Sequence, residues 1–544
     1  MATEQWFYLD STSGGLVLGV IAITFFLLEI RARQLNPSRL PVFNDRKWWE
    51  FGYGKATKRY IDDPEGLIKA GLKKGGDAFY LCTESHFRLI LSPKYADVIG
   101  GDSRFDLGKF IGEVSISGYG AQFSVKYLPT FRTFIMEYRD LSQYRTLPWN
   151  PRFYRTLSRQ SWHVRPQNLS IRFLKKLGWP WIVIGLKKQV YLPILNSSNM
   201  MTRRRYSNFK AEWHQVNLRY TASQIVAQMV CRGFLGDEDL CKNQEWLDLM
   251  YEFLETTFIA AHELRRWPMP MRRLASRFIP KCREVRVQLQ EVEKYLKPLL
   301  DKEIGPDSQT NALEWVKEAS KGCLYDFTTL QLTLALASLD TSSDLIAKAI
   351  CDLSENPALV DDIRNEVVEI VGKEGLTKSS TQRLYLLDSA IKESQRLRPL
   401  GYSNMERLAK EKVVLPDGLI IPKGTAIMVS ACHMMDSSVW PNGDKYDGYR
   451  FANLRKNAKD SLTSPYQLTS TSPDHMGFGH GKQACPGRHY AAMFLKVALC
   501  HIIMKYDFNV ILPEEGYVQL RGHNILPHSN IKIDIRRRKE EISL

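Results

Sequence analysis

The hydrophobic pattern divides the chain into an apolar stretch near its start, a short region of strand-like runs and a long series of helical repeats. Residues 14–30 are apolar apart from Thr24 and Glu29. Strand-like runs at residues 79–81 and 87–91 precede a helical stretch at 93–99. Apolar positions recur at helical spacing in longer segments, residues 222–234, 246–264 and 325–354. The pattern predicts a mainly α protein with a small β-rich region.

The apolar stretch at residues 14–30 is long enough to span a bilayer, which takes roughly 17–25 residues. A cleaved signal peptide would need positive charge before its apolar core, but the preceding residues carry Glu4 and Asp10 and no Lys or Arg. Basic residues follow the stretch instead: Arg31, Arg33, Arg39, Arg46 and Lys47. By the positive-inside rule we predict an uncleaved anchor, with residues 1–13 in the lumen and the bulk of the chain in the cytosol.

Composition adds a linker and a redox compartment to this picture. Pro37 and Pro41 favour extended backbone, so residues 31–44 are predicted to be a linker. With 544 residues, 44% apolar and 25% charged, the remainder is globular, and length alone suggests two to four domains. The nine cysteines have no C-x-x-C spacing and are odd in number, which argues against a disulfide framework or a zinc site and favours a reducing compartment.

The net charge of +16 comes from one segment. Residues 141–211 contain fourteen Lys or Arg and no Asp or Glu, which leaves 61 of the 75 basic residues against 59 acidic ones elsewhere. Three interpretations stay open: a basic surface for anionic lipid or nucleic acid, a diverged functional region, or sequence that is not native coding sequence, such as a retained intron. A nucleic-acid binder is disfavoured, because no recognised binding module accompanies the basic segment.

A glycine-rich loop with a single cysteine stands out near the C-terminus, at residues 478–488, before a helix-like run at 491–503. A lone cysteine is often a buried structural residue. Here, however, Gly479, Gly481 and Gly487 surround Cys485, and glycine allows positive φ and close approach to the backbone. Such a setting suits a thiolate that binds haem iron from one side.

These residues resemble the F-x-x-G-x-x-x-C-x-G motif of the cytochrome P-450 haem-thiolate monooxygenases, with Phe478, Gly481, Cys485 and Gly487 at the motif positions. The resemblance covers roughly residues 40–115 and 212–535. It implies the P-450 fold over residues 45–544, with heme b as cofactor and Cys485 as the axial ligand of the iron. The family often has Arg or His two residues before the cysteine, near a haem propionate, where this chain has Gln483.

Two further parts of the haem site follow from the resemblance. Arg407 corresponds to a residue that pairs with a haem propionate. The family's W-x-x-x-R motif, whose Arg also contacts a propionate, is absent from the region of residues 120–211, where three arginines are candidates to replace it: Arg152, Arg155 and Arg165.

The segment 337–343 places a polar cluster inside an otherwise apolar helix. A purely structural interpretation has Thr341 bonding back to the carbonyl of Ala337 and Asp340 pairing with a cation. The segment also resembles the family's oxygen-activation motif, in which Asp340 and Thr341 would deliver protons as the catalytic pair. Because of this match, we favour the catalytic interpretation.

A charge network and the substrate contacts are likewise implied by the resemblance. Glu393 and Arg396 match the family's E-x-x-R, which with Arg450 forms a buried network behind the haem loop; Gly448 replaces a more usual proline there. The substrate-contact candidates are Ala337, Leu400 and Tyr402. We expect residues 265–273, which mix Trp, Met, Pro and Arg, to form a loop that touches membrane lipid or, equally, an ordinary surface loop.

The resulting hypothesis is a monooxygenase of the endoplasmic reticulum membrane, single-pass, that oxidises a hydrophobic small molecule. The motifs resemble fungal microsomal members of secondary metabolism, many of which act on terpenoids. Electrons would come from an NADPH-cytochrome P-450 reductase, docked near the cysteine loop by Lys482, Arg488 and Lys496. The alternatives are a haem-thiolate enzyme that couples or rearranges polyketides or alkaloids, and a non-catalytic membrane protein that keeps the scaffold.

Overall fold

The computed structural model describes residues 40–84, 86–111, 212–265, 267, 269–301, 327–456, 464–521, 524–542 and 544. The predicted anchor at 14–30, most of the predicted linker and the basic segment 141–211 with its three candidate arginines lie outside these residues. No helix among the described residues is both long and apolar enough to cross a bilayer.

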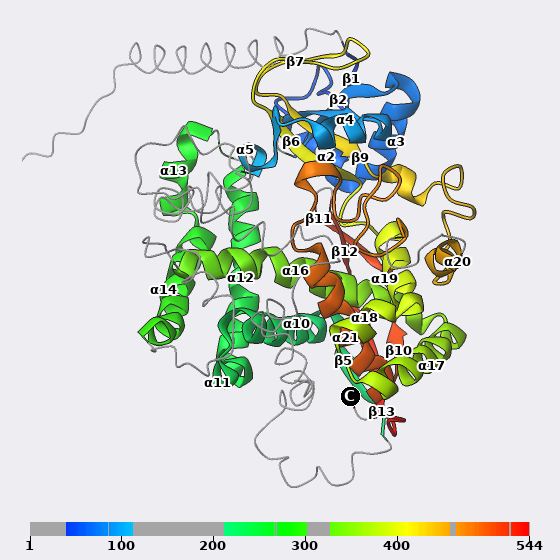
Figure 1. The fold of residues 1–544 in the computed structure, drawn as a ribbon. Helices are drawn as coiled ribbons and strands as arrows, with labels where there is room; N and C mark the ends of the chain where they lie inside the picture. Colours follow the sequence, from blue (N-terminus) through cyan, green and yellow to red (C-terminus); the bar gives the residue numbers. More distant parts are fainter. Residues whose placement is uncertain are drawn as a thin grey trace, which may run out of the picture.

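Helices make up most of the described chain (Figure 1). The helices before the gap at 112–211 are α2 (Gly54–Asp62), α3 (Pro64–Gly75), α4 (Ala96–Gly101) and α5 (Leu107–Ile111). Those that follow up to residue 354 are α10 (Leu218–Leu235), α11 (Glu238–Lys242), α12 (Gln244–Arg265), α13 (Met269–Phe278), α14 (Pro280–Asp301) and α16 (Phe327–Ser354). The last are α17 (Pro357–Glu374), α18 (Lys378–Arg383), α19 (Tyr385–Leu397), α20 (Arg450–Lys456) and α21 (Arg488–Lys505).

The strands form one larger sheet and three small ones. The larger sheet has the order β1-β2-β3-β9-β6-β4, with bounds Val42–Phe43, Ala78–Thr83, His86–Leu91, Ala426–Ser430, Ser403–Ala409 and Phe105–Asp106. The small sheets are β10-β13-β5 (Tyr506–Ile511, Lys532–Arg537, His214–Asn217), β11-β12 (Val518–Arg521, Asn524–Pro527) and β7-β8 (Val413–Val414, Ile420–Ile421). The mainly helical class with a small β-rich region is therefore confirmed.

The larger sheet joins distant parts of the sequence. The predicted strand pair is present, because β2 and β3 are antiparallel with Phe79 opposite Ile90. Strand β3 also pairs with β9 in parallel, so that Leu89 lies opposite Ile427. Residues before the gap at 112–211 and residues after 400 thus form one sheet, which lies at the top of Figure 1 together with α2, α3 and α4.

The helices pack around α16, which crosses the middle of the molecule (Figure 1). Helices α10, α19 and α21 all contact α16, and the residues of α16 from Ser342 to Asp352 are buried. The predicted helices at 222–234 and 246–264 are present and extend slightly beyond those bounds, as α10 and α12. Helix α10 begins where the Asn217 side chain accepts a hydrogen bond from Tyr220 N at 2.9 Å, a standard N-cap.

The prediction of a loop over residues 265–273 is wrong for its second half, because α13 begins at Met269. Pro270 lies in the first turn of α13, where a backbone N–H has no partner within the helix, so a proline does not break it. Trp267 and Met271 are nevertheless exposed, as a surface position requires.

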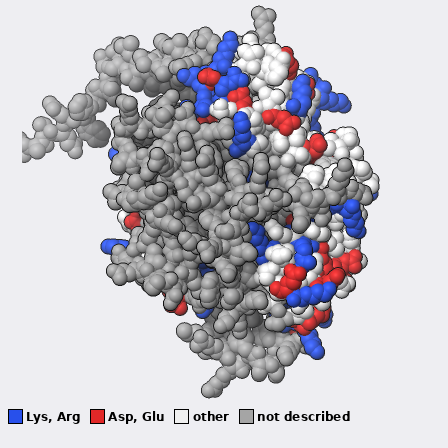
Figure 2. All heavy atoms as spheres, in the orientation of Figure 1, with Lys and Arg blue, Asp and Glu red and all other residues white. Residues whose placement is uncertain are grey.

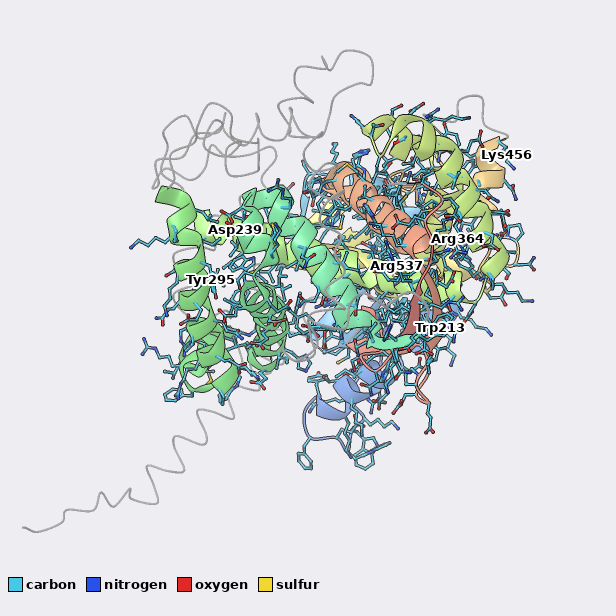
Figure 3. All side chains as sticks on the ribbon, turned by 90° about the horizontal axis from the view of Figure 1, so that it is seen from below. Trp213, Asp239, Tyr295, Arg364, Lys456 and Arg537 are labelled. Carbon is cyan, nitrogen blue, oxygen red and sulfur yellow. The ribbon has the colours of Figure 1, made fainter. Side chains whose placement is uncertain are left out.

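Charge on the described surface is mixed. Figure 2 shows Lys and Arg side chains interspersed with Asp and Glu over the described part of one face. Figure 3 shows Asp239 and Tyr295, on α11 and α14, at one side of the molecule, and Trp213, Arg364 and Arg537 at the other. On that second side Arg364, Arg536 and Arg538 all pair with Asp507 of β10.

Candidate active site

The cysteine loop connects the single-turn 3₁₀ helix Gly481–Gln483 to α21, and Cys485 lies between them. A tight backbone turn sets its position, since Cys485 N donates to Phe478 O at 2.8 Å and Gly479 N donates to Met476 O at 2.8 Å. Among the described cysteines Cys485 alone is exposed, whereas the other seven are buried. A thiol on an accessible loop is available to a ligand, and the buried cysteines are not.

Two glycines of this loop have the geometry that the sequence predicts. Gly479 and Gly481 have φ of 69° and 76°, in the left-handed region that favours glycine. A Cβ on Gly481 would lie 2.4–2.5 Å from backbone atoms of Gly100 in α4. Gly487 differs, because its φ is −81° and a Cβ there would lie 3.8 Å from the Cys485 sulfur. Close packing on α4 therefore depends on Gly481.

Two opposing effects act on the pKa of the Cys485 thiol. Crowding by protein atoms desolvates the sulfur and raises the pKa of the thiol, while the N–H groups of Gly487 and Arg488 and the Arg488 charge favour the thiolate and lower that pKa. Arg488 Nη1 also donates to Cys485 O at 2.9 Å. A bound metal ion favours the deprotonated thiol further, so these groups fit a thiolate ligand.

Arg407 is buried beside the cysteine loop, with 2% of its surface exposed. Its Nη1 donates to Glu406 O at 2.7 Å and its Nη2 to Gln483 O at 3.4 Å, but its Nε has no hydrogen-bond partner. Burial lowers the pKa of Arg407 to about 10. A buried guanidinium with an unsatisfied donor carries a cost that an anionic ligand removes. The residues present therefore fit a haem whose propionate lies at Arg407.

A bulge in β6 places Arg407. The register of β6 against β9 shifts between Asn404 and Arg407, and Met405 has a φ of 52°, which a non-glycine residue rarely adopts. Asn404 Nδ2 donates to Met476 O at 2.7 Å, which ties this bulge to the cysteine loop. The sequence contained no signal for the bulge, since Met405 is not a residue that favours positive φ.

Gln483, where the family often has Arg or His, has a clear structural role. Its Nε2 donates to Phe105 O at 2.7 Å, and its Oε1 accepts from Leu107 N at 3.1 Å. One amide side chain thus fastens the cysteine loop to the turn between β4 and α5. Sequence analysis missed this, because both partners are backbone groups more than 370 residues away.

Asp340 and Thr341 lie near the middle of α16, just before the run of buried residues that begins at Ser342. Thr341 Oγ1 donates to Ala337 O at 2.9 Å, so the i−4 bond of the structural interpretation is present. Both Ala337 and Thr341 are exposed, although the ten residues after Thr341 are buried. Asp340 points to another side, with Oδ1 3.9 Å from Arg219 of α10. The helix continues unbroken from Phe327 to Ser354.

Asp340 and Arg219 border a small cavity between α10, α12 and α16. Its volume of about 20 Å³ is room for about one water molecule. The polar side chains that line it are Arg219, Ser223, Tyr251, Glu255, Asp340 and Ser343. Water in such a polar cavity can exchange protons with the Asp340 carboxylate.

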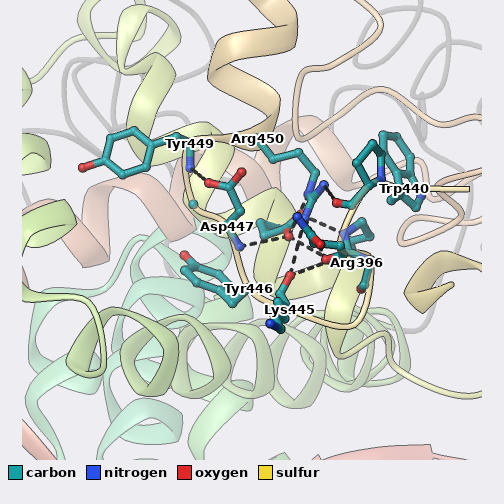
Figure 4. Close-up of polar contacts among 12 residues, drawn as sticks. Arg396, Trp440, Lys445, Tyr446, Asp447, Tyr449 and Arg450 are labelled. Carbon is teal, nitrogen blue, oxygen red and sulfur yellow. Dashed lines mark hydrogen bonds and ion pairs between the residues drawn. The ribbon is translucent and has the colours of Figure 1, made fainter. Parts of the chain in front are cut away.

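The three residues predicted to form a charge network lie together, and Figure 4 shows two of them, Arg396 and Arg450, close to each other. Both Glu393 oxygens accept from Arg396 at 2.8 Å, and Oε1 also accepts from Arg450 Nε at 2.9 Å. The Glu393 and Arg396 side chains are fully buried. Gly448 leaves room for Leu359, whose Cδ2 would lie 2.3 Å from a Cβ at that position.

The candidate substrate contacts separate into two groups. Leu400 is exposed, and its carbonyl accepts from Ile525 N at 2.9 Å. Tyr402 instead packs against the apolar cluster of Tyr60, Ile68 and Phe79 in the β-rich region. Ala337 and Leu400 are therefore accessible to a ligand, whereas Tyr402 packs against other residues of the protein.

The prediction that Lys496 helps to dock a reductase is wrong. Lys496 lies on the buried face of α21, where its Nζ is 2.5 Å from Asp388 Oδ1, so it cannot meet a partner protein. Helix α21 is apolar on nearly all sides and is buried from Ala492 to Met504, as a helix without a polar face is expected to be, so its sequence pattern already indicated burial of Lys496. Lys482 is exposed.

Comparison with known proteins shows the family of this chain. The family model described as Cytochrome P-450 matches residues 186–530. The chain belongs to the cytochrome P-450 family. It is 35% identical over 545 residues to the cytochrome P-450 monooxygenase adrA of Penicillium rubens, with 97% of each chain covered. It is 32% identical to the monooxygenase esdpI of Penicillium shearii, with 98% of each covered, and 33% identical to nodR of Hypoxylon pulicicidum, with 92% of each covered. The cytochrome P-450 family uses heme with a cysteine thiolate as axial ligand, and the matched residues of this chain include Cys485.

Proposed function

We propose that this cytochrome P-450 monooxygenase of fungal secondary metabolism hydroxylates or oxidises a terpenoid, with electrons from an NADPH-cytochrome P-450 reductase. The observation that supports it best is the exposed Cys485 on a glycine loop beside the unsatisfied Nε of Arg407. Haem bound there would supply dioxygen activation. Cys485 Sγ would hold the iron, and Arg407 would hold a propionate.

The protons come from α16 in this proposal. The Thr341 hydroxyl donates to Ala337 O in the structure, and rotation about χ1 frees it to donate into the space beside Ala337. Asp340, next to the polar cavity and Arg219, replenishes the proton from water.

An apolar substrate fits the accessible residues. Ala337 and Leu400 offer aliphatic surface, and a hydrophobic skeleton is best recognised by such contacts. The named relatives are fungal monooxygenases, and the resemblance of the motifs to members that act on terpenoids supports that substrate class.

Membrane attachment and electron supply complete the proposal. The apolar run at 14–30 anchors the protein in the endoplasmic reticulum membrane, with the catalytic domain in the cytosol. The reductase docks at the cysteine loop, where the exposed Lys482 offers positive charge to its acidic surface.

The test is co-expression of the full chain with a fungal NADPH reductase and a terpene cyclase from the same gene neighbourhood, under labelled dioxygen. The proposal expects a new terpenoid product that carries one labelled oxygen atom. A coupled or rearranged product without the label would favour the second candidate, a haem-thiolate enzyme that does not insert oxygen. Unchanged terpenoid despite a correctly ligated haem would contradict the substrate class.

A further inference from the structure

Two buried charged residues on α19, separate from the Glu393 network, hydrogen-bond to the backbone of residues 467–470, which precede the cysteine loop. Asp388 and Lys392 lie four residues apart, on one face of the helix, with 4% and 1% of their surfaces exposed. Lys392 Nζ donates to Gln467 O at 2.8 Å and to Ser470 O at 3.0 Å. Asp388 Oδ2 accepts from Leu468 N at 2.8 Å. Two side chains thus satisfy three backbone groups of residues 467–470.

Other buried charges complete this cluster. Asp388 is also 3.2 Å from Arg455 of α20 and 2.5 Å from Lys496 of α21. The Lys392 Nζ lies 5.1 Å from the centre of the Phe451 ring. Burial lowers the pKa of Lys392 to about 7, so keeping its amine in the core has a free-energy cost, which the bonds to the Gln467 and Ser470 carbonyls offset.

Residues 467–470 are connected to Cys485 by hydrogen bonds of Arg488. Thr469 lies between the two carbonyls that Lys392 binds, and its own carbonyl accepts from Arg488 Nε at 3.1 Å. The same guanidinium donates through Nη1 to Cys485 O at 2.9 Å. A continuous series of contacts therefore runs from Lys392 through residues 467–470 and Arg488 to Cys485.

We propose that Asp388 and Lys392 are positioning residues for the haem thiolate. By holding residues 467–470 they fix the Arg488 guanidinium, which in turn fixes the backbone of Cys485 and the positive charge beside its sulfur. The Glu393 network does not perform this task, because its hydrogen bonds go to residues 434–450. This inference rests on haem ligation by Cys485, and not on the substrate or the redox partner of the proposed function.

The chain contains a matched control lysine. Lys348 of α16 is likewise 1% exposed, pairs with Asp344 four residues earlier at 2.7 Å, and donates to Ile525 O at 2.7 Å and Pro399 O at 3.3 Å. Like Lys392, it is a buried amine that donates to two backbone carbonyls, but these belong to segments other than 467–470. Lys→Met at either position removes two carbonyl contacts, and at Lys348 it also removes the ion pair with Asp344, so K348M is the more severe of the two changes.

The experiment compares K392M and K348M in the purified full-length holoprotein, at a temperature well below both melting temperatures. We expect K392M to lose haem to a scavenging protein about 10-fold faster, as is typical when support of a ligand is removed. We also expect a smaller fraction of its reduced carbon-monoxide complex to show the thiolate-type Soret band. K348M should match wild type in both measurements. Equal effects of the two variants, or no effect of K392M, would overturn the proposal.

A double-mutant cycle tests the route through Arg488. If Lys392 acts through Arg488, R488M should reproduce the spectral change, and K392M/R488M should change the haem-loss rate little beyond R488M alone. Additive effects on that rate would overturn the route. D388N, which keeps the side-chain shape, replaces K392M if the latter does not fold. A wild type that itself lacks the thiolate-type band would overturn the haem assignment and the positioning role with it, whereas a wild type with that band and an unchanged K392M would overturn the positioning role alone.

Discussion

Single residues of the candidate active site combine a conformational task with a chemical one. Thr341 illustrates this best, because its hydroxyl is occupied by Ala337 O and yet its side chain is exposed. The Thr341 side chain is therefore accessible, which the proposed proton-delivery role requires.

The first prediction replaces this hydroxyl. T341A should form product roughly 100-fold more slowly, the lower range for loss of a general acid, while it continues to consume NADPH. T341S keeps the hydroxyl and should stay close to wild type. The measurement is product formed per NADPH oxidised, with the substrate identified by the co-expression experiment. Equal yields from T341A and wild type would show that Thr341 has only its helix hydrogen bond.

The roles of residues in the candidate active site were predictable only where a short sequence motif indicated them. Cys485, Gly481 and the Thr341–Ala337 bond follow from short stretches of sequence. Gln483 and Arg488 do not, because their partners are the backbone groups of Phe105, Leu107 and Thr469, and any residue offers those groups. Side chains that bind backbone leave no complementary residue type for a sequence pattern to show.

Elements meet the cysteine loop through backbone contact, and α4 is the closest case. Gly100 and Gly481 approach so tightly that a side chain on Gly481 would collide with the α4 backbone. Backbone cannot move aside as a flexible side chain can. The packing of α4 on the loop therefore depends on the absence of a Cβ.

The second prediction compares two glycine substitutions. G481A and G418A both place a Cβ at positive φ, with φ of 76° and 86°, which costs about 1–2 kcal/mol each. Only G481A also meets backbone within 2.5 Å, whereas nothing lies within 4 Å of a Cβ at Gly418. G481A should therefore lose clearly more stability in denaturant unfolding, and lose haem. Similar unfolding midpoints for the two variants would show that the contact with α4 is unimportant.

The third prediction concerns the link from α19 to residues 434–450. E393Q leaves Arg396 and Arg450 buried without their carboxylate, which should cost about 3–5 kcal/mol of unfolding free energy. E291Q breaks the exposed pair with Lys294 on α14, also three residues apart, and should cost only a few tenths of a kcal/mol. Chemical denaturation of both variants measures the difference. A comparable small loss in E393Q would mean that its charges are solvated.

Predictions of elements succeeded where periodicity is strong. The long helices α10, α12 and α16 were expected from apolar spacing alone, but the start of α13 at Met269 was not, because Pro270 suggested a break. The order of the six-stranded sheet could not be predicted either. Its central pairing of Leu89 with Ile427 joins segments more than 300 residues apart, and periodicity carries no information on such pairs.

The whole molecule holds the cysteine loop from several directions at once. Gly100 of α4 packs against Gly481, and Phe105 of β4 binds the Gln483 side chain. Asn404 and Arg407 of β6 donate to the carbonyls of Met476 and Gln483, and α19 binds residues 467–470 just before the loop. These elements come from both ends of the described chain. Their common purpose is to present one sulfur atom and one cation to a single ligand.

The carbon-monoxide difference spectrum of the reduced, purified full chain tests most directly whether Cys485 is the ligand of haem iron. Wild type should show the Soret band of a thiolate-ligated haem, and C485A should lack it, whereas C432A, which removes a buried cysteine away from the loop, should keep it. A C485A protein with the wild-type band would contradict the account.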